Sequence, residues 1–314
     1  LVNMLRMGLT KQPSESDGHD LPLSIKSLRR RIRNEGSHVL QPFTATPIDL
    51  TTVANFPLEH LADFEKATDP MIFLHRNIYD LTQHIFSLPH LAQHMILSPA
   101  IATRYNEVVY DDLHTSQWWS DLQRSVGDDD VVILPLMLSS DATLVSGNGK
   151  NKAWPIYMTI GNVPKGVRYK KEYGACRVLG YLPVINVLPE YAGKPWISKC
   201  KMAIYHHCMK LLMAPFSGST SQTKFFQGPF GSVYKCLPRL ATYSADYPEQ
   251  NLLALTKSWT NGYGCPRCTV ESSEYRKGVN GVAVRRSNSN MIQFASTEDF
   301  GTMIFTSLVA YIGT

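Results

Sequence analysis

Residues 131–141 constrain the fold of this chain more than any other segment. They begin with an uninterrupted apolar run, Val-Val-Ile-Leu-Pro-Leu-Met-Leu, and end with two serines and Asp141. A continuous apolar run of this length is typical of a strand that is buried on both faces of a sheet. The acidic residues 128–130 before it indicate a turn. The sequence therefore predicts a central strand that leaves the core at Asp141.

Two further strands are predicted directly after the first. A turn rich in Gly and Asn spans residues 146–151, and the segments 153–162 and 176–188 have the composition of a second and a third strand. Three strands in succession with short connections indicate an antiparallel meander.

The sequence after this meander predicts a helix, a fourth strand and another helix. Residues 195–214 carry an apolar stripe and open with a proline, which suits a first helical turn. Residues 215–231 are rich in Gly, Ser and Phe and are predicted to form a loop, whereas residues 233–246 are predicted to form a strand. A helix is expected from Pro248. This order of elements is that of an α/β fold of the RNase H-like type, with a mixed sheet and flanking helices.

The sequence before residue 128 has a different character. Residues 1–56 are rich in Ser, Thr, Pro, Asp and Gly and are predicted to be a poorly ordered arm. Its basic run at residues 26–33 suits nuclear import, contact with a DNA backbone, or a solvated helix face. Residues 57–127 combine helical periodicity with several prolines, which predicts a small helical region. The core is expected over residues 128–280, and the status of residues 281–314 stays open.

Asp141 and Asp246 occupy equivalent positions, because each directly follows an apolar strand. The first and fourth strands of an RNase H-like sheet are neighbours, so we expect the two carboxylates side by side. Such a pair repels unless cations neutralise it, and hard oxygen ligands suit Mg²⁺ or Mn²⁺. Two such ions could activate a water or a 3′-hydroxyl at a phosphodiester. The alternative is that each aspartate only caps a turn or a helix.

Cys265 and Cys268 are the one closely spaced pair among the six cysteines. Two thiolates at this C-x-x-C spacing suit zinc, but a full site needs two more ligands. No histidine follows His207 and there is no second C-x-x-C. The pair is therefore half of a zinc site or two reduced core thiols, since a redox pair needs a thioredoxin-like βαβ setting.

The composition narrows the class of protein only a little. The formal net charge of +5 fits a nucleic-acid partner, and also many ordinary enzymes. There is neither a G-x-S-x-G elbow nor a Walker loop, so a hydrolase triad and an NTPase are not indicated. The apolar-rich run at residues 302–313 is too short and too polar to span a bilayer comfortably, so no membrane association is expected and the chain is predicted to be soluble and intracellular.

Several unusual strings occur along the chain in a fixed order. They are SDAT, AWPIYMTIGN, GYLP, ADYPEQ and CPRC, beginning at residues 140, 153, 180, 245 and 265. In this order the strings resemble the fungal Plavaka-type transposases, which are related to the Kyakuja–Dileera–Zisupton and CACTA-like elements. The resemblance covers residues 60–270.

The resemblance implies an RNase H-like DDE/D transposase in the nucleus, which cuts and joins DNA with divalent metal. It assigns Asp141 and Asp246 to the first two catalytic acids, and Cys265 and Cys268 to a C-x-x-C that follows the second acid. The third acid and a downstream Asp-x-Leu-His segment of the family have no clear match here.

Because the third acid is unmatched and the sequence opens with Leu1, we expect a truncated or degenerate copy. Such a chain is either an enzyme that acts on transposon ends and target DNA or a catalytically inactive DNA-binding remnant. A third hypothesis is a zinc-stabilised interaction module. Whether the chain cleaves DNA, and whether it forms a homo-oligomer, are questions that the sequence leaves open.

Overall fold

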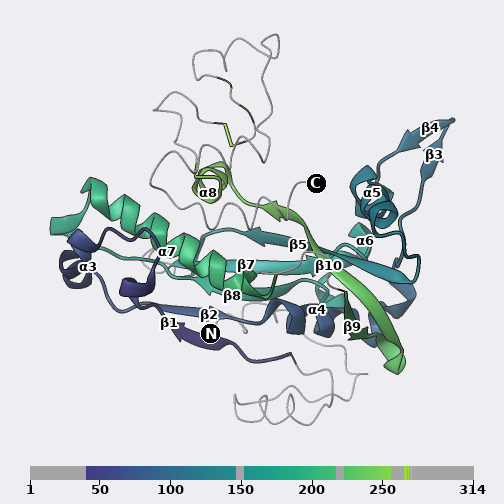
Figure 1. Cartoon of the computed structure of the whole chain (residues 1–314), viewed down its shortest axis with the longest axis horizontal. Coiled ribbons are helices and arrows are strands. Elements are labelled where there is room, and N and C mark those ends of the chain that lie inside the picture. The colour runs from purple at the N-terminus through teal and green to yellow at the C-terminus, as the bar shows by residue number, and fades with distance from the viewer. Residues whose placement is uncertain are drawn as a thin grey trace, which may run out of the picture.

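A mixed sheet forms the centre of the computed structural model, which describes residues 40–145, 152–216 and 223–255 and four positions near the cysteine pair, Cys265, Pro266, Cys268 and Val270. The strand order is β1-β2-β8-β7-β5-β10-β9, and β6 pairs with β7 beside this path (Figure 1). The strands of this sheet are β1 (Thr44–Pro47), β2 (Ile72–His75), β5 (Val131–Ser140), β6 (Thr143–Leu144), β7 (Lys152–Ile160), β8 (Arg177–Leu182), β9 (Lys224–Gln227) and β10 (Val233–Ser244).

The central strands follow the prediction. β5 is buried along most of its length, as the apolar run requires. It pairs antiparallel with β7, which in turn pairs antiparallel with β8, so the predicted meander is confirmed. On its other side β5 pairs in parallel with β10, which confirms that the first and fourth predicted strands are neighbours. The arrangement, with helices flanking the sheet, is an α/β RNase H-like fold.

The sheet is wider than the sequence predicted at both edges. β1 and β2 extend it beyond β8, and β9 extends it beyond β10. β1 falls within the predicted arm at residues 1–56, and β9 falls within the predicted loop at residues 215–231. Both strands have four residues, which is too short for a hydrophobic period to show. The prediction of an arm is wrong from β1 onward, because Ile48, Leu50, Val53 and Phe56 are all buried.

Helices flank the sheet and connect its strands (Figure 1). They are α3 (Leu61–Ala67), α4 (Ile78–Phe86), α5 (Gln117–Val126), α6 (Lys165–Arg168), α7 (Pro195–Met213) and α8 (Tyr247–Leu253). Short 3-10 helices span Leu50–Thr52, Leu58–His60, Pro89–His94, Leu113–Thr115, Lys171–Tyr173, Pro189–Tyr191, Ala214–Phe216 and Pro229–Gly231.

The region at residues 57–127 is only partly helical. It contains α3, α4 and α5, and the side chain of Asn77 caps α4 by accepting hydrogen bonds from two backbone amides. The same region also contributes β2 to the sheet and forms a separate hairpin of β3 (Ala102–Arg104) and β4 (Glu107–Val109). In Figure 1 this hairpin stands away from the sheet. The predicted helical region therefore contains helices and, in addition, three strands of three or four residues, which are too short for a hydrophobic period to show.

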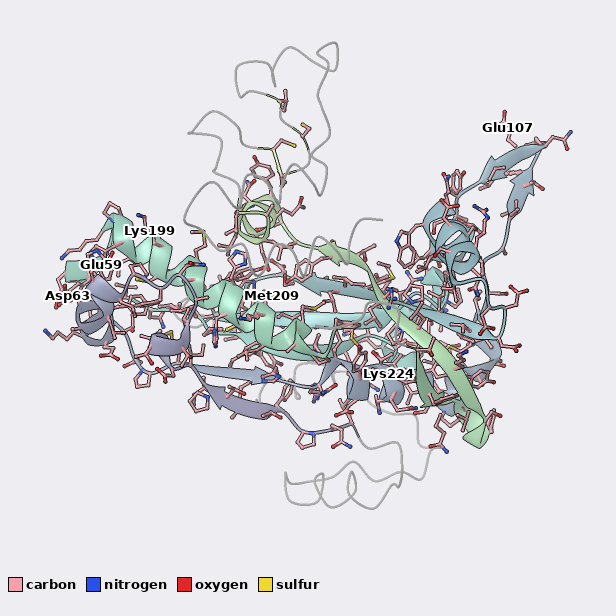
Figure 2. All side chains as sticks on the ribbon, viewed as in Figure 1. Glu59, Asp63, Glu107, Lys199, Met209 and Lys224 are labelled. Atoms are coloured by element: carbon pink, nitrogen blue, oxygen red, sulfur yellow. The ribbon has the colours of Figure 1, made fainter. Side chains whose placement is uncertain are left out.

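The long helix α7 packs its apolar stripe into the core. Of the four residues in the stripe, Ile197, Ile204 and Cys208 are buried and Leu211 is partly buried against the core. Figure 2 labels two residues that show the contrast between its faces, the exposed Lys199 and the buried Met209. Among the described residues, no helix combines the length and the apolarity that a membrane crossing needs.

A buried ion pair ties the segment before α5 to α6. Arg168 contacts Asp112 at 2.8 Å, and the two side chains are 3% and 6% exposed. Arg168 also donates to the carbonyl of Val163, while Asp112 accepts from the amides of Leu113 and Lys165. Burial alone would raise the pKa of Asp112, but the hydrogen bonds from Arg168, Leu113 and Lys165 outweigh it and hold that pKa below its usual value.

His206 connects α7 to α8 from a buried position. Its Nε2–H donates to the carbonyl of Leu252 at 2.9 Å, and within the described ranges its Nδ1 has no hydrogen-bond partner. Burial lowers the pKa of His206 from 6.5 to about 4, so the folded state holds the neutral ring at pH 7.

We expect acid to destabilise the fold through His206. Because the pKa of His206 is lower in the folded state, the unfolded state binds a proton first as the pH falls. The contribution of the neutral ring to the stability of the fold is therefore complete above pH 6.5 and is lost as the pH falls toward about 4. By pH 5 the loss in the free energy of unfolding is about 2 kcal/mol. Urea unfolding at several pH values measures it. His206→Gln keeps a donor for Leu252 and does not titrate, so its stability should depend less on pH. The control is His90→Gln, at an exposed position, which should keep the pH dependence of the wild type. If the stability of His206→Gln depends on pH as strongly as that of the wild type and of this control, the expectation is wrong.

Candidate active site

Asp141 and Asp246 lie at the same end of two adjacent parallel strands. The last paired residues of β5 and β10 are Ser139 and Ser244, and each aspartate comes two positions later. Neighbouring strands lie about 4.8 Å apart, so a parallel register brings such residues out of the sheet next to each other. Both side chains are exposed. The predicted pair thus lies exposed at one end of the sheet.

The two aspartates differ in their local roles. Asp246 is the N-cap of α8, and its Oδ1 accepts a hydrogen bond of 2.9 Å from the amide of Glu249. The alternative prediction, that the aspartate caps a helix, is therefore correct for Asp246. The cap uses only one of the two carboxylate oxygens, Oδ1. Asp141 is followed by the short strand β6 and has no helix to cap.

A third carboxylate, Glu249, is buried beside these strand ends, and the sequence did not single it out. The residue is 5% exposed. Its Oε1 accepts from the hydroxyl of Ser140, the last residue of β5, and from the hydroxyl of Tyr205 at 3.3 Å. Its Oε2 accepts from the indole N–H of Trp154 at 3.1 Å. The Tyr243 hydroxyl lies 2.7 Å from the Ser140 hydroxyl and donates to Oε1 at 3.4 Å.

The electrostatics of this cluster follow from its burial. Burial raises the pKa of Glu249, hydrogen bonds from Ser140, Trp154 and Tyr205 oppose that shift, and the charge of Asp246 adds to it. Burial also raises the pKa of Tyr205 well above its usual value, so its hydroxyl stays protonated and remains a donor. The cluster is thus one carboxylate surrounded by donors.

Local sequence could not have revealed the position of Glu249. It stands three residues after an Asp N-cap, where a glutamate ordinarily completes a capping box at the helix surface. Here its side chain turns into the core instead, toward donors from β5, β7, α7 and β10. The donors come from Ser, Trp and Tyr residues that are distant in sequence, so no local pattern indicates that they meet at Glu249.

A divalent metal ion fits the exposed pair better than it fits Glu249. Mg²⁺ is commonly held by one or two carboxylates, with waters and substrate phosphates as its other ligands. Asp141 and Asp246 offer such oxygen atoms at an exposed edge, whereas the oxygens of Glu249 already accept several hydrogen bonds. Over the described ranges, no group of three or more His, Cys, Asp or Glu side chains could hold an ion. The remaining ligands would have to come from water, DNA or other parts of the chain.

The cysteine pair is described only in part. Cys265 and Cys268 are both half-buried. Segments on either side of them lie outside the described residues, so a zinc ligand set stays a prediction. The basic run at residues 26–33 and the tail at residues 281–314 also lie outside the described residues.

Comparison with known proteins adds one finding about the family. The family model described as Plavaka transposase matches residues 51–309, a span that includes Asp141, Asp246 and the cysteine pair. A comparison with curated proteins returns no match.

Proposed function

The chain belongs to the Plavaka transposase family, and from this premise we propose that it is a DDE/D-type enzyme that cleaves and joins DNA at transposon ends in the nucleus. The parallel pairing of β5 with β10 carries the proposal, because it brings Asp141 and Asp246 to one exposed end of the sheet. Membership of a transposase family implies DNA as the partner.

The proposed mechanism gives the two aspartates the task of holding divalent metal against a phosphodiester. The cap that Asp246 provides for α8 fixes its Oδ1 and leaves Oδ2 for a ligand. Asp141, which is exposed and caps no helix, would contribute from the neighbouring strand. A Mg²⁺ or Mn²⁺ ion held there would supply Lewis-acid chemistry, which makes a water or a 3′-hydroxyl a better nucleophile and offsets phosphate charge. The proposal extends to Cys265 and Cys268 as two ligands of a structural zinc ion.

A second candidate function is a DNA-binding remnant that does not cleave. It is favoured by one observation, that within the described ranges no group of three or more His, Cys, Asp or Glu side chains is arranged to hold a metal ion. Two carboxylates alone would hold metal more weakly than three.

DNA cleavage by the whole chain separates the two functions. The substrate is a duplex that carries the ends of the encoding element, with Mn²⁺ as the metal and binding measured in parallel by gel shift. Strand cleavage that EDTA abolishes supports the enzyme. Binding without cleavage at any Mn²⁺ concentration supports the remnant and contradicts the leading proposal.

A further inference from the structure

We infer that Glu249 is a positioning residue, which holds the two strand-end aspartates in the arrangement that their function needs. The inference rests on the proposed function, because it assigns Glu249 a role toward the same site. Glu249 contacts Asp246 directly and contacts the residue that precedes Asp141. Its carboxylate accepts from Ser140, the residue before Asp141, and its backbone amide donates to Asp246.

The same carboxylate joins elements that meet at this end of the sheet. Ser140 belongs to β5, Trp154 to β7, Tyr205 to α7 and Tyr243 to β10, and each donates to Glu249. Glu249 itself lies in the first turn of α8. A shift of any of these strand ends would break a hydrogen bond to a buried acceptor, which costs more than losing an exposed one. The cluster therefore resists movement of β5 relative to β10.

The contacts require an acceptor, and a carboxylate suits them better than an amide. An ionised carboxylate only accepts hydrogen bonds, and it does so through two oxygens. The indole N–H of Trp154 and the hydroxyl of Tyr205 lie on different oxygens of Glu249. A glutamine has the same shape, but its NH₂ group would face one of these donors. Glu249→Gln therefore preserves volume and disturbs the cluster.

The hydrogen bonds to Glu249 are expected to affect the positions of Asp141 and Asp246 more than the stability of the fold. Ligands of a metal site must be held within about 0.5 Å of their productive positions, and supporting contacts supply that restraint. Changes in such supporting residues typically weaken metal affinity or activity by about 10–100-fold. A role for Glu249 in positioning should therefore appear in the metal dependence and in the local order of the two strand ends.

The test compares Glu249→Gln with wild type in the full chain, using two readouts. Hydrogen–deuterium exchange should accelerate at residues 139–141 and at the amide of Glu249. The Mn²⁺ concentration for half-maximal DNA cleavage should rise by about tenfold, while the melting temperature changes by a few degrees. Glu172→Gln is the matched control, because Glu172 is exposed and makes none of the hydrogen bonds of the cluster, and it should leave both readouts unchanged.

Two further variants keep the test informative if Glu249→Gln does not fold. Ser140→Ala removes the contact next to Asp141, whereas Tyr205→Phe removes a contact from α7. We expect Ser140→Ala to accelerate exchange at residues 139–141 and to raise the Mn²⁺ requirement more than Tyr205→Phe does.

The outcomes separate this inference from the proposed function. Exchange and Mn²⁺ dependence that match wild type in Glu249→Gln, or in Ser140→Ala where the first variant is unfolded, overturn the positioning role. If the wild type cleaves no DNA while Glu249→Gln accelerates exchange at residues 139–141 and at the amide of residue 249, the proposed function is overturned and the positioning role of Glu249 is supported.

Discussion

Asp246→Asn is expected to reduce Mn²⁺-dependent DNA cleavage by about 10²–10³-fold and to leave the melting temperature almost unchanged. Asp246 caps α8 by accepting the amide of Glu249 through Oδ1. Asn ranks with Asp as an N-cap residue, so the start of the helix is preserved. The amide carries no charge, and a metal site loses several kcal/mol of transition-state stabilisation when such a ligand is removed, which corresponds to this fall in rate.

This substitution separates the two roles that Asp246 could have. If Asp246 is only a cap, Asp246→Asn changes neither stability nor cleavage. In that case Asp246→Ala lowers the stability by about 1 kcal/mol without an effect on cleavage. If it is a metal ligand, Asn already removes the activity. Asp141→Asn should reduce cleavage by a comparable factor. Because Asp141 caps no helix, a lost helix cap cannot explain that reduction.

The measurement is single-turnover cleavage of end DNA at saturating Mn²⁺, together with thermal melting of each variant. Asp63→Asn is a suitable control, because Asp63 is exposed on α3 and is labelled in Figure 2 away from the strand ends. Cleavage by Asp246→Asn at the wild-type rate would refute the role of this residue as a ligand.

The strands that carry the two aspartates could be predicted because their signals are local. The apolar run of β5 and the polar residues that follow it are contiguous in sequence. The pairing of β5 with β10 followed from the order of elements, since an RNase H-like order makes these strands neighbours. Asp141 and Asp246 were therefore expected at one end of the sheet, and the parallel register has them there.

The supporting contacts could not be predicted in the same way. Ser140, Trp154 and Tyr205 are 109, 95 and 44 positions away from Glu249, so no periodicity connects them. The edge strands β1 and β9 escaped prediction for another reason. With four residues each, they are defined by pairing with strands far away in sequence and not by a pattern of their own.

Asp112→Asn is expected to lower the free energy of unfolding by about 3–5 kcal/mol. The substitution leaves the charge of Arg168, whose side chain is 3% exposed, without its partner. Asp112 also caps the 3-10 helix at Leu113–Thr115, but a lost cap does not explain a destabilisation of this size. An asparagine can still accept the hydrogen bond from the amide of Leu113. Urea unfolding at pH 7 gives the measurement.

The neighbouring residue supplies a matched control within the same segment. Asp111 pairs with Lys165, and these side chains are 59% and 56% exposed. An exposed pair contributes about 0–1 kcal/mol, so Asp111→Asn should change the stability little. Replacing both buried partners, with Asp112→Asn and Arg168→Met, should recover part of the loss, because no uncompensated charge then remains in the core. Equal and small effects of Asp111→Asn and Asp112→Asn would show that the buried pair does not stabilise this part of the fold.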